Sequence, residues 1–348
     1  MEAIQAVDLI PRYNEDFFNC YMGHLVSYLK LLDIPVELTF YKCLEPMQRI
    51  YHSFVIHGRD RWHFPSPFFD LNLLGLRAFT EQHASLEQAK PSILKRLREK
   101  KAVFFSGDGY YVPHRIETYQ QRYQPHNFLL TGYRETEGGA EWFVQDHARP
   151  DYAGWYEESI VRDCYNRADY PFAHYIAYYE LDRDTLVKLS QEELVRQVET
   201  YLDMYVDDFS LYDQMAEQGI EAAKGLKDRE GHSADRGVPS EEGAATASVP
   251  LSAMETMIVL ERCLFFLASS RELFERFLVE AKLEEDVAPL LDQIKKTAFG
   301  ARAQLMRGRT GRLNEERWTS LLKELKGHEE ELLARLRLKY LRMGNLAN

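Results

Sequence analysis

The sequence predicts an α+β protein that is followed by an all-helical C-terminal region. Short runs rich in β-branched and aromatic residues alternate with helical patterns up to about residue 180, which is typical of mixed strands and helices. Beyond Leu181 the apolar residues instead recur every three or four positions, the spacing of an amphipathic helix. The aromatic content changes at the same place, because 33 of the 44 Phe, Tyr and Trp residues precede Leu181. We therefore expect two halves that are built differently.

The first helix is expected to begin at Cys20. Asn19 is a favourable N-cap residue, and Leu25, Leu29 and Leu32 give the following segment one apolar face. Cys20 would then lie in the first turn of this helix.

Five runs of β-branched and aromatic residues predict the strands. They are Val36–Tyr41, Ala102–Ser106, Asn127–Tyr133, Glu141–Gln145 and Phe172–Tyr179. The polar, glycine-containing segment Arg134–Ala140 separates the third run from the fourth and predicts the loop of a β-hairpin. These two strands are therefore expected to pair antiparallel.

The remainder of the chain is expected to be helical, with one interruption. Ser190 and the acidic residues after it resemble a capping box, and the spacing that follows predicts a helix to about Lys224. Residues 225–250 are poor in large apolar side chains and predict a flexible linker. Three more helices are expected near Ser252–Lys282, Glu285–Met306 and Asn314–Arg342. The expected organisation is a domain over 1–180, a helical extension over 181–224, the linker over 225–250 and a helical region over 251–348.

Charge and hydropathy exclude several classes of partner. The formal net charge of −12 at pH 7 repels a polyanion, so binding to nucleic acid is disfavoured. The acidic N-terminal segment lacks the features of a secretory signal. The most apolar stretch, Met257–Ser269, contains Glu261 and Arg262 and is too short to cross a bilayer. We expect a cytoplasmic protein with no membrane or nucleic-acid partner.

The sequence also predicts that the protein has no cofactor and no metal. The four cysteines form no CxxC pair, which disfavours a zinc knuckle or a disulfide scaffold. His52, His57 and His63 are spaced by five and six residues, which matches no helical metal-binding pair. No GxGxxG, Walker A or GxSxG pattern occurs, so nucleotide and serine-hydrolase chemistry lack support.

Cys20 is the candidate nucleophile. The N-terminus of a helix presents unpaired N–H groups and a positive partial charge, which stabilise a thiolate and lower the pKa of the thiol. The alternative is that Cys20 is a small buried apolar residue, which is the commoner role of an isolated cysteine.

His126 and Asp146 are the candidate partners of Cys20. A simple hairpin centred on the predicted loop would bring them opposite each other at its open end. An imidazole that is oriented by a carboxylate and faces a thiol is the arrangement that activates a nucleophile and protonates a leaving group. The alternative is that both residues simply flank a solvated loop. His24, four residues after Cys20, and His114 are alternative candidates for the base.

Three segments together resemble the butirosin biosynthesis protein H N-terminal family. They are Asn19–Leu29 around the candidate nucleophile, Ala102–His114, and His126–Asp146. The resemblance extends over about residues 12–180, and it rests on the order and spacing of the motifs. That family is similar to papain-like and C39-like cysteine peptidases, so the resemblance implies a papain-like fold with an antiparallel sheet for this part of the chain.

The resemblance also implies a function. It implies an acyltransferase of natural-product biosynthesis that takes an acyl group from an acyl-carrier-protein thioester onto Cys20 and passes it to a small amine acceptor. Within the wider superfamily, Asn14 matches the position of an amide side chain in the oxyanion hole. The alternatives are a thioesterase or peptidase, which differs only in its acceptor, and a noncatalytic binding or scaffold protein that has kept the fold.

Two further features have open interpretations. Tyr110, Tyr111 and Pro113 could line the site, with Asp108 available to a cationic acceptor, or the tyrosines could simply pack over the sheet. The basic stretch Lys295–Arg312 could dock an anionic carrier protein, or it could be a solvated helix face.

Overall fold

The computed structural model describes residues 3–5, 8–13, 18–59, 64, 69–148, 150–170, 173–182, 184, 190–230, 251–283 and 287–341. The chain divides into two compact units. We call residues 1–39 and 69–189 the sheet unit, and residues 40–68 and 190–348 the helical unit. The predicted segment boundaries placed residues 40–68 in the first domain, whereas their contacts group them with the C-terminal helices.

The sheet unit contains one antiparallel sheet. Its strands are β1 (Ala3–Gln5), β2 (Leu76–Gln82), β3 (Val103–Asp108), β4 (Pro125–Thr136), β5 (Gly139–Asp146), β6 (Tyr152–Glu157) and β7 (Tyr175–Leu181). The strands follow the order β2-β7-β3-β4-β5-β6, and β1 pairs with β4. The prediction of an α+β fold with an antiparallel sheet is confirmed. That the fold is papain-like stays a prediction.

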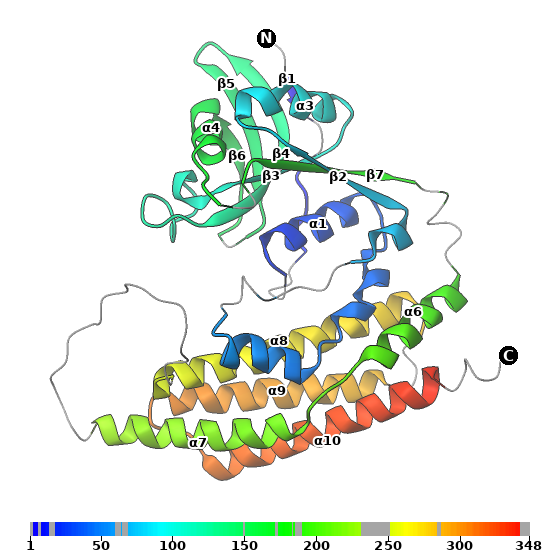
Figure 1. Cartoon of the computed structure of the whole chain (residues 1–348), viewed down its shortest axis with the longest axis vertical. Coiled ribbons are helices and arrows are strands. Elements are labelled where there is room, and N and C mark those ends of the chain that lie inside the picture. The colour runs from blue at the N-terminus through cyan, green and yellow to red at the C-terminus, as the bar shows by residue number, and fades with distance from the viewer. Residues whose placement is uncertain are drawn as a thin grey trace. The chain divides into compact units, whose positions relative to one another are not determined.

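Helices cover both faces of this sheet (Figure 1). On one face α3 (Leu86–Arg98) and α4 (Glu158–Asn166) pack on Val103, Phe105 and Trp142. Because side chains alternate along a strand, Phe104 points the other way. There its ring lies 5.3 Å and 6.0 Å from the rings of Tyr21 and Tyr28, which belong to α1 (Cys20–Leu31).

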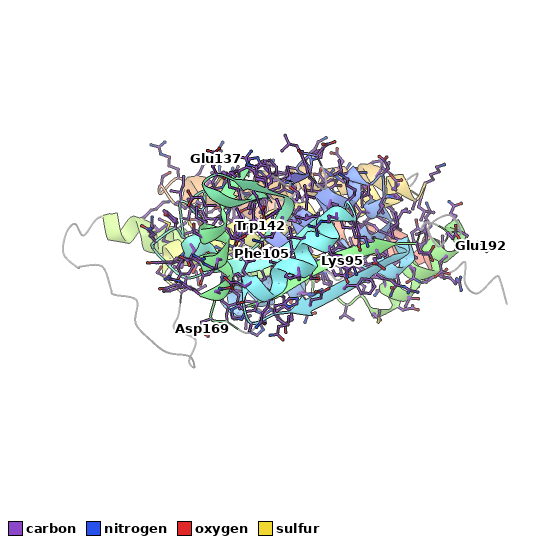
Figure 2. The ribbon with its side chains drawn as sticks, turned by 90° about the horizontal axis from the view of Figure 1, so that it is seen from above. Lys95, Phe105, Glu137, Trp142, Asp169 and Glu192 are labelled. Carbon is purple, nitrogen blue, oxygen red and sulfur yellow. The ribbon has the colours of Figure 1, made fainter. Side chains whose placement is uncertain are left out.

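The interior of the α3 side is densely filled. Figure 2 shows Phe105 and Trp142 among the side chains of this layer, with Glu137 at its margin. The ring of Phe105 lies 5.0 Å from that of Phe128 and 4.9 Å from that of Tyr165. These apolar contacts fix β3 and β4 side by side, and the start of β4 carries His126.

The helical unit is built around a ring of four helices, α7 (Ser210–Glu230), α8 (Ala253–Glu280), α9 (Ala288–Gly308) and α10 (Glu315–Tyr340). Each of them packs against two of the others. The unit also contains α2 (Met47–Tyr51), the π-helix η2 (His52–Ile56) and α6 (Gln191–Met204). Arg271 of α8 is fully buried, and its Nε donates to Oε1 of Glu329 on α10 at 2.9 Å.

Several predicted elements are confirmed. Asn19 caps α1 at Cys20, its side chain accepting from the N–H of Met22 at 2.9 Å. The strands expected at Ala102–Ser106 and Phe172–Tyr179 correspond to β3 and β7, and the three C-terminal helices correspond to α8, α9 and α10. The predicted linker lies outside the described residues from position 231 onward, and α7 extends into its first part.

Two predictions are wrong. Val36–Tyr41 is part of a 3₁₀-helix, η1 (Val36–Cys43), and not a strand, because a short run that is buried on all sides carries no period that separates helix from strand. The helix predicted from Ser190 to Lys224 is broken between α6 and α7. There Oδ1 of Asp208 accepts from the N–H and the hydroxyl of Ser210 at 3.0 Å and 2.6 Å, which starts a second helix.

Within the part of the chain that the structure describes, no helix combines the length and the apolar character that crossing a membrane requires. The cytoplasmic location expected from the sequence stays a prediction.

The packing of α7 against α10 can be tested at Gly219. A Cβ atom on this residue would lie 2.7 Å from Nε1 of Trp318, which is fully buried and donates to the carbonyl of Ala216 at 3.0 Å. We expect Gly219→Ala to lower the free energy of unfolding by about 1–3 kcal/mol, because the indole cannot move aside. The measurement is denaturant unfolding followed by circular dichroism.

Gly327→Ala is the matched control, since Gly327 lies inside α10 with nothing within 4 Å of an added Cβ. The higher helix propensity of alanine alone predicts that Gly327→Ala raises the free energy of unfolding by about 0.5–1 kcal/mol. Equal stability of the two variants would contradict the packing described here.

Candidate active site

Cys20 is the first residue of α1 and is half-buried, whereas the other three cysteines of the chain are buried. Burial raises the pKa of the thiols of Cys164 and Cys263. Cys20 is therefore the one cysteine of the chain that is not fully buried, and it lies at a helix N-terminus.

The predicted β-hairpin is present, but the register is not the one we expected. Its turn is short, since Thr136 already pairs with Gly139. A bulge between Leu130 and Gly132 then shifts the register by one residue. As a result Leu129 pairs with Gln145. The prediction that His126 lies directly opposite Asp146 is therefore wrong.

The bulge decides which side chains share a face. A one-residue change of register reverses every side chain, so without the bulge His126 and Asp146 would point to opposite faces. Beyond the bulge, continuing the Leu129–Gln145 register by one residue sets Asp146 opposite Phe128, two residues from His126. Residues two apart on a strand share a face, and diagonal neighbours remain within reach.

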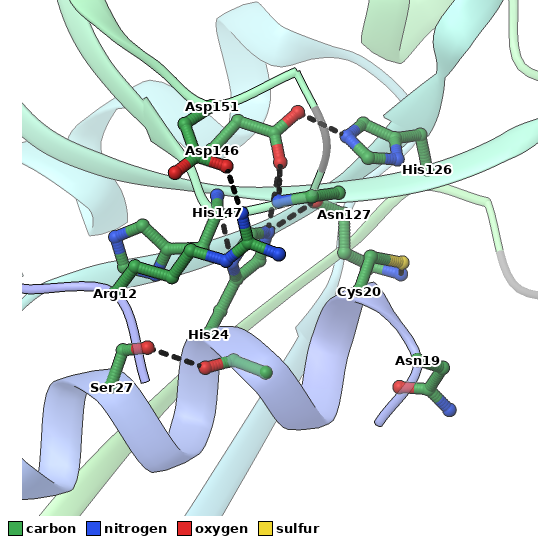
Figure 3. A network of polar contacts seen from close by, with 12 residues as sticks. Arg12, Asn19, Cys20, His24, Ser27, His126, Asn127, Asp146, His147 and Asp151 are labelled. Carbon is green, nitrogen blue, oxygen red and sulfur yellow. Dashed lines mark hydrogen bonds and ion pairs between the residues drawn. The ribbon is translucent and has the colours of Figure 1, made fainter. Parts of the chain in front are cut away.

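The side chains of His126 and Asp146 therefore meet, as Figure 3 shows. Nε2 of His126 lies 2.6 Å from Oδ2 of Asp146, and both side chains are buried. Since Asp146 occupies Nε2, Nδ1 is the nitrogen of His126 left for its hydrogen bond with Cys20. The three predicted residues lie together in the order thiol, imidazole, carboxylate.

Electrostatics favours a charged pair of Cys20 and His126. Burial raises the pKa of the Cys20 thiol, but the hydrogen bond and charge of His126 outweigh burial and leave this pKa below its ordinary value. Burial lowers the pKa of His126, but the charge and hydrogen bond of Asp146, with the contact to Cys20, raise it to about 9. Between these two pKa values the pair is a thiolate and an imidazolium.

Asp146 is ionised over the whole of this range. Its burial raises the pKa of its carboxyl, but the charge of His126 and the hydrogen bonds from His114 and His126 hold that pKa well below its usual value. Oδ1 also accepts from the N–H of Ala148 at 2.9 Å. A buried carboxylate with several donors remains charged.

His24 does not act as the base in this geometry. Its Nε2 lies 2.7 Å from the carbonyl oxygen of Asn127, and its Nδ1 lies 3.4 Å from the backbone nitrogen of His147. Burial lowers the pKa of His24 to about 3, despite the charge of Asp146. The ring is neutral, donates through Nε2, and joins α1 to the start of β4.

Asn127 is a site residue that the sequence interpretation did not identify. Its Nδ2 lies 3.7 Å from Sγ of Cys20, and its hydrogen bonds contribute to lowering the pKa of the thiol. The signal was available, because alternation along β4 turns Asn127 away from Phe128 and toward the α1 side of the sheet. The predicted oxyanion-hole residue Asn14 lies outside the described residues.

His114 also reaches the site, although not as a base for Cys20. Its Nε2 lies 2.7 Å from Oδ2 of Asp146, the same oxygen that His126 contacts. These two nitrogens and a carboxylate oxygen of Asp146 form the one cluster of the described residues that could hold a metal ion. Two ligands of a tetrahedral zinc ion stand about 3.3 Å apart, so contacts of 2.6 Å and 2.7 Å fit hydrogen bonds instead. The expected absence of a metal stays a prediction.

The segment 109–124 between β3 and β4, which we call the tyrosine-rich loop, packs on itself. Asp108 is buried, and its Oδ1 accepts from the N–H groups of Tyr110 and Gln124 at 2.9 Å each. This carboxylate is engaged in shaping the loop, which argues against a role in binding a cationic acceptor. The ring of Tyr110 stacks on that of Tyr123 with centroids 4.4 Å apart.

The basic stretch Lys295–Arg312 is largely paired with acidic side chains. Lys295 pairs with Glu275, and Lys296 lies 2.6 Å from Asp292. Arg302 and Arg309 both pair with Glu261. These ion pairs favour the interpretation of a solvated helix face over that of a docking patch.

The comparisons agree with the motifs. The chain is 31% identical over 140 residues to the ribostamycin:4-(gamma-L-glutamylamino)-(S)-2-hydroxybutanoyl-acyl-carrier-protein 4-(gamma-L-glutamylamino)-(S)-2-hydroxybutanoate transferase of Niallia circulans. The predicted family resemblance is confirmed for this stretch. The match covers 39% of this chain and 46% of the relative, so the aligned part is less than half the relative's length. No family model matches the chain.

The pKa values predict the pH dependence of Cys20 alkylation. The lowered thiol pKa means that the rate of reaction with iodoacetamide should rise and level off at a pH below the ordinary thiol pKa. In His126→Ala the imidazolium is lost. The part of the pH profile in which the alkylation rate rises, its rising limb, should therefore move to higher pH, toward the ordinary pKa of a thiol. Stopped-time alkylation followed by intact-mass measurement gives both profiles.

His83→Ala is the control, since His83 also lies beside a carboxylate, with Nε2 3.1 Å from Oε2 of Glu81. A wild-type profile that rises only near the ordinary thiol pKa would contradict the ion pair.

Proposed function

We propose that this protein is an acyltransferase that carries an acyl group on Cys20, taking it from an acyl-carrier-protein thioester and delivering it to a small amine. The contact of Cys20, His126 and Asp146 carries the proposal, because it supplies a nucleophile, a proton carrier and an orienting carboxylate. The similarity to a carrier-protein-dependent transferase supports the choice of donor.

The acylation step follows from the charged pair. The Cys20 thiolate attacks the carbonyl carbon of the donor thioester and forms a tetrahedral oxyanion. The C–S bond to the carrier then breaks, and the departing pantetheine sulfur takes the Nδ1 proton of His126. The acyl group is then bound to Sγ of Cys20, and His126 is neutral.

The transfer step reverses the proton movement. The amine attacks the acyl carbon, its proton passes to Nδ1 of His126, and the Cys20 thiolate leaves as the amide forms. The thiolate and the imidazolium are thereby restored. Asp146 stays ionised throughout and holds the imidazole by its Nε2–H.

Two groups among the described residues are proposed to stabilise the oxyanion. Cys20 begins a helix, so its own N–H group points toward charge that develops on the carbonyl oxygen. Nδ2 of Asn127, at 3.7 Å from Sγ, is a second donor close to the reacting carbon. The role expected for Asn14 in the same place remains part of the proposal.

Hydrolysis is the second candidate, since the same three residues would serve a thioesterase or peptidase. The contact of Cys20 with His126, which Asp146 holds, favours an enzyme over a noncatalytic scaffold, because these three groups together are those that activate a thiol. The acceptor therefore distinguishes the remaining candidates, and the acyl-enzyme is common to both.

The proposal is tested by intact-mass analysis after incubation with acyl-carrier-protein thioesters, the relative's 4-(gamma-L-glutamylamino)-(S)-2-hydroxybutanoyl donor among them. We expect an acyl adduct on the wild type and none on Cys20→Ala. Addition of an amine should release amide from a transferase, whereas free acid alone would indicate hydrolysis. An adduct that persists in Cys20→Ala, or none with any donor, contradicts the proposal.

Asp146→Asn should slow adduct formation by about tenfold or more, because a neutral amide no longer raises the pKa of His126 and the charged pair with Cys20 is less populated. Asp151→Asn is the matched control. Asp151 is an exposed aspartate whose Oδ1 accepts from Arg12 at 2.6 Å. Cys20 of the Asp151→Asn variant should therefore be acylated at the wild-type rate. Equal effects of the two substitutions would remove Asp146 from the mechanism.

A further inference from the structure

His114 is fixed on three sides within the sheet unit. Its Nε2 lies 2.7 Å from Oδ2 of Asp146, and its Nδ1 lies 2.7 Å from the hydroxyl of Tyr156. Its ring stacks on that of Tyr152, with centroids 4.4 Å apart and planes 4° from parallel. Such a side chain has one orientation available, and that orientation aims it at Asp146.

The hydrogen bonds determine the proton positions. An ionised carboxylate accepts only, so Nε2 of His114 must carry a proton and donate to Asp146. With the proton of the neutral ring on Nε2, Nδ1 can only accept, so the hydroxyl of Tyr156 donates to it and itself accepts from the backbone N–H of His114 at 3.3 Å. Burial lowers the pKa of His114, with Asp146 opposing that change, so the ring is neutral.

Oδ2 of Asp146 consequently receives two imidazole N–H groups, one that takes part in the proposed reaction and one that does not. Of these two histidines, His126 is the one that contacts Cys20. The proton on Nδ1 of His126 comes and goes in the proposed reaction, whereas His114 has no described contact with the thiol. A carboxylate held from a second, static direction keeps its position while its reactive partner changes charge.

We propose that His114 is a positioning residue of the candidate active site, which holds Oδ2 of Asp146 in the place where His126 binds it. Tyr156 fixes the tautomer of His114, and Tyr152 fixes the plane of its ring. This inference rests on the proposed function, because positioning matters only if His126 and Cys20 react. It extends the predicted triad of Cys20, His126 and Asp146 into a hydrogen-bonded chain of five residues.

Other titratable groups face this chain and must be considered in any pH experiment. His114 faces Asp146, His126 and the guanidinium of Arg115. Asp146 also faces His24, whose Nε2 lies 3.5 Å from Oδ1, and His147. The pKa of each of these two histidines is lowered by burial, so neither adds a charge near neutral pH.

The test is the pH profile of Cys20 alkylation by iodoacetamide, with Cys20→Ala as the blank. His114→Phe keeps a stacking ring and removes the donor, so we expect a rate at pH 7 that is lower by about tenfold or more. A carboxylate that is free to turn stabilises the imidazolium less, so the rising limb should also move to higher pH. His114→Gln retains an N–H near the position of Nε2, and its rate should lie within about threefold of the wild type.

Tyr156→Phe keeps the test decisive if His114→Phe fails to fold. Without the hydroxyl, His114 is no longer held in one tautomer. The rising limb of the alkylation profile should therefore move to higher pH, by a smaller amount than in His114→Phe. An unchanged profile in folded His114→Phe, a limb that moves to lower pH, or a Gln variant as impaired as the Phe variant would each overturn the inference. Failure of every acyl donor would overturn the proposed function, and it would leave this alkylation result unaffected.

Discussion

The interaction on which the candidate site depends is the set of hydrogen bonds to the buried carboxylate of Asp146. Burying an ionised carboxylate is costly unless its oxygens are satisfied, and two oxygens can accept several donors. Here the donors are His126 and His114 on Oδ2 and Ala148 on Oδ1, with His24 3.5 Å away. These residues come from α1, the tyrosine-rich loop, β4 and the segment after β5. The carboxylate therefore brings together parts of the chain that are far apart in sequence.

The bulge in β4 is the backbone feature that makes this interaction possible. The tight turn at Thr136 and Gly139 sets a register that would turn His126 and Asp146 to opposite faces. The bulge between Leu130 and Gly132 changes the register by one residue and restores a common face. Bulges often re-aim side chains beside functional sites. The apolar packing of Phe128 against Phe105 then holds the corrected register in place.

The sequence predicted the features that depend on short-range chemistry. The start of α1 was evident because Asn19 is a good cap and an apolar face follows it. The contact of His126 with Asp146 was predicted from a register that was wrong by two residues. The predicted contact still forms, because a shift of two residues along a strand leaves a side chain on the same face of the sheet. Apart from Asn127, the features that the sequence missed depend on tertiary contacts. Nothing near His114 indicates that Tyr156 and Asp146 will hold it, and nothing local in Asp207 shows that its oxygens will accept from the N–H groups of Met47 and Gln48.

The contact between Cys20 and His126 also gives the proposed reaction its order. Part of the rise in the pKa of His126 comes from the thiolate, through a hydrogen bond and through charge. Acylation would convert that thiolate into a neutral thioester, so this part of the rise would disappear and the pKa of His126 would fall from about 9. A neutral imidazole is the form that accepts a proton from an attacking amine. The imidazolium would therefore be the acid for the first step, and loss of the thiolate would itself make His126 the base for the second.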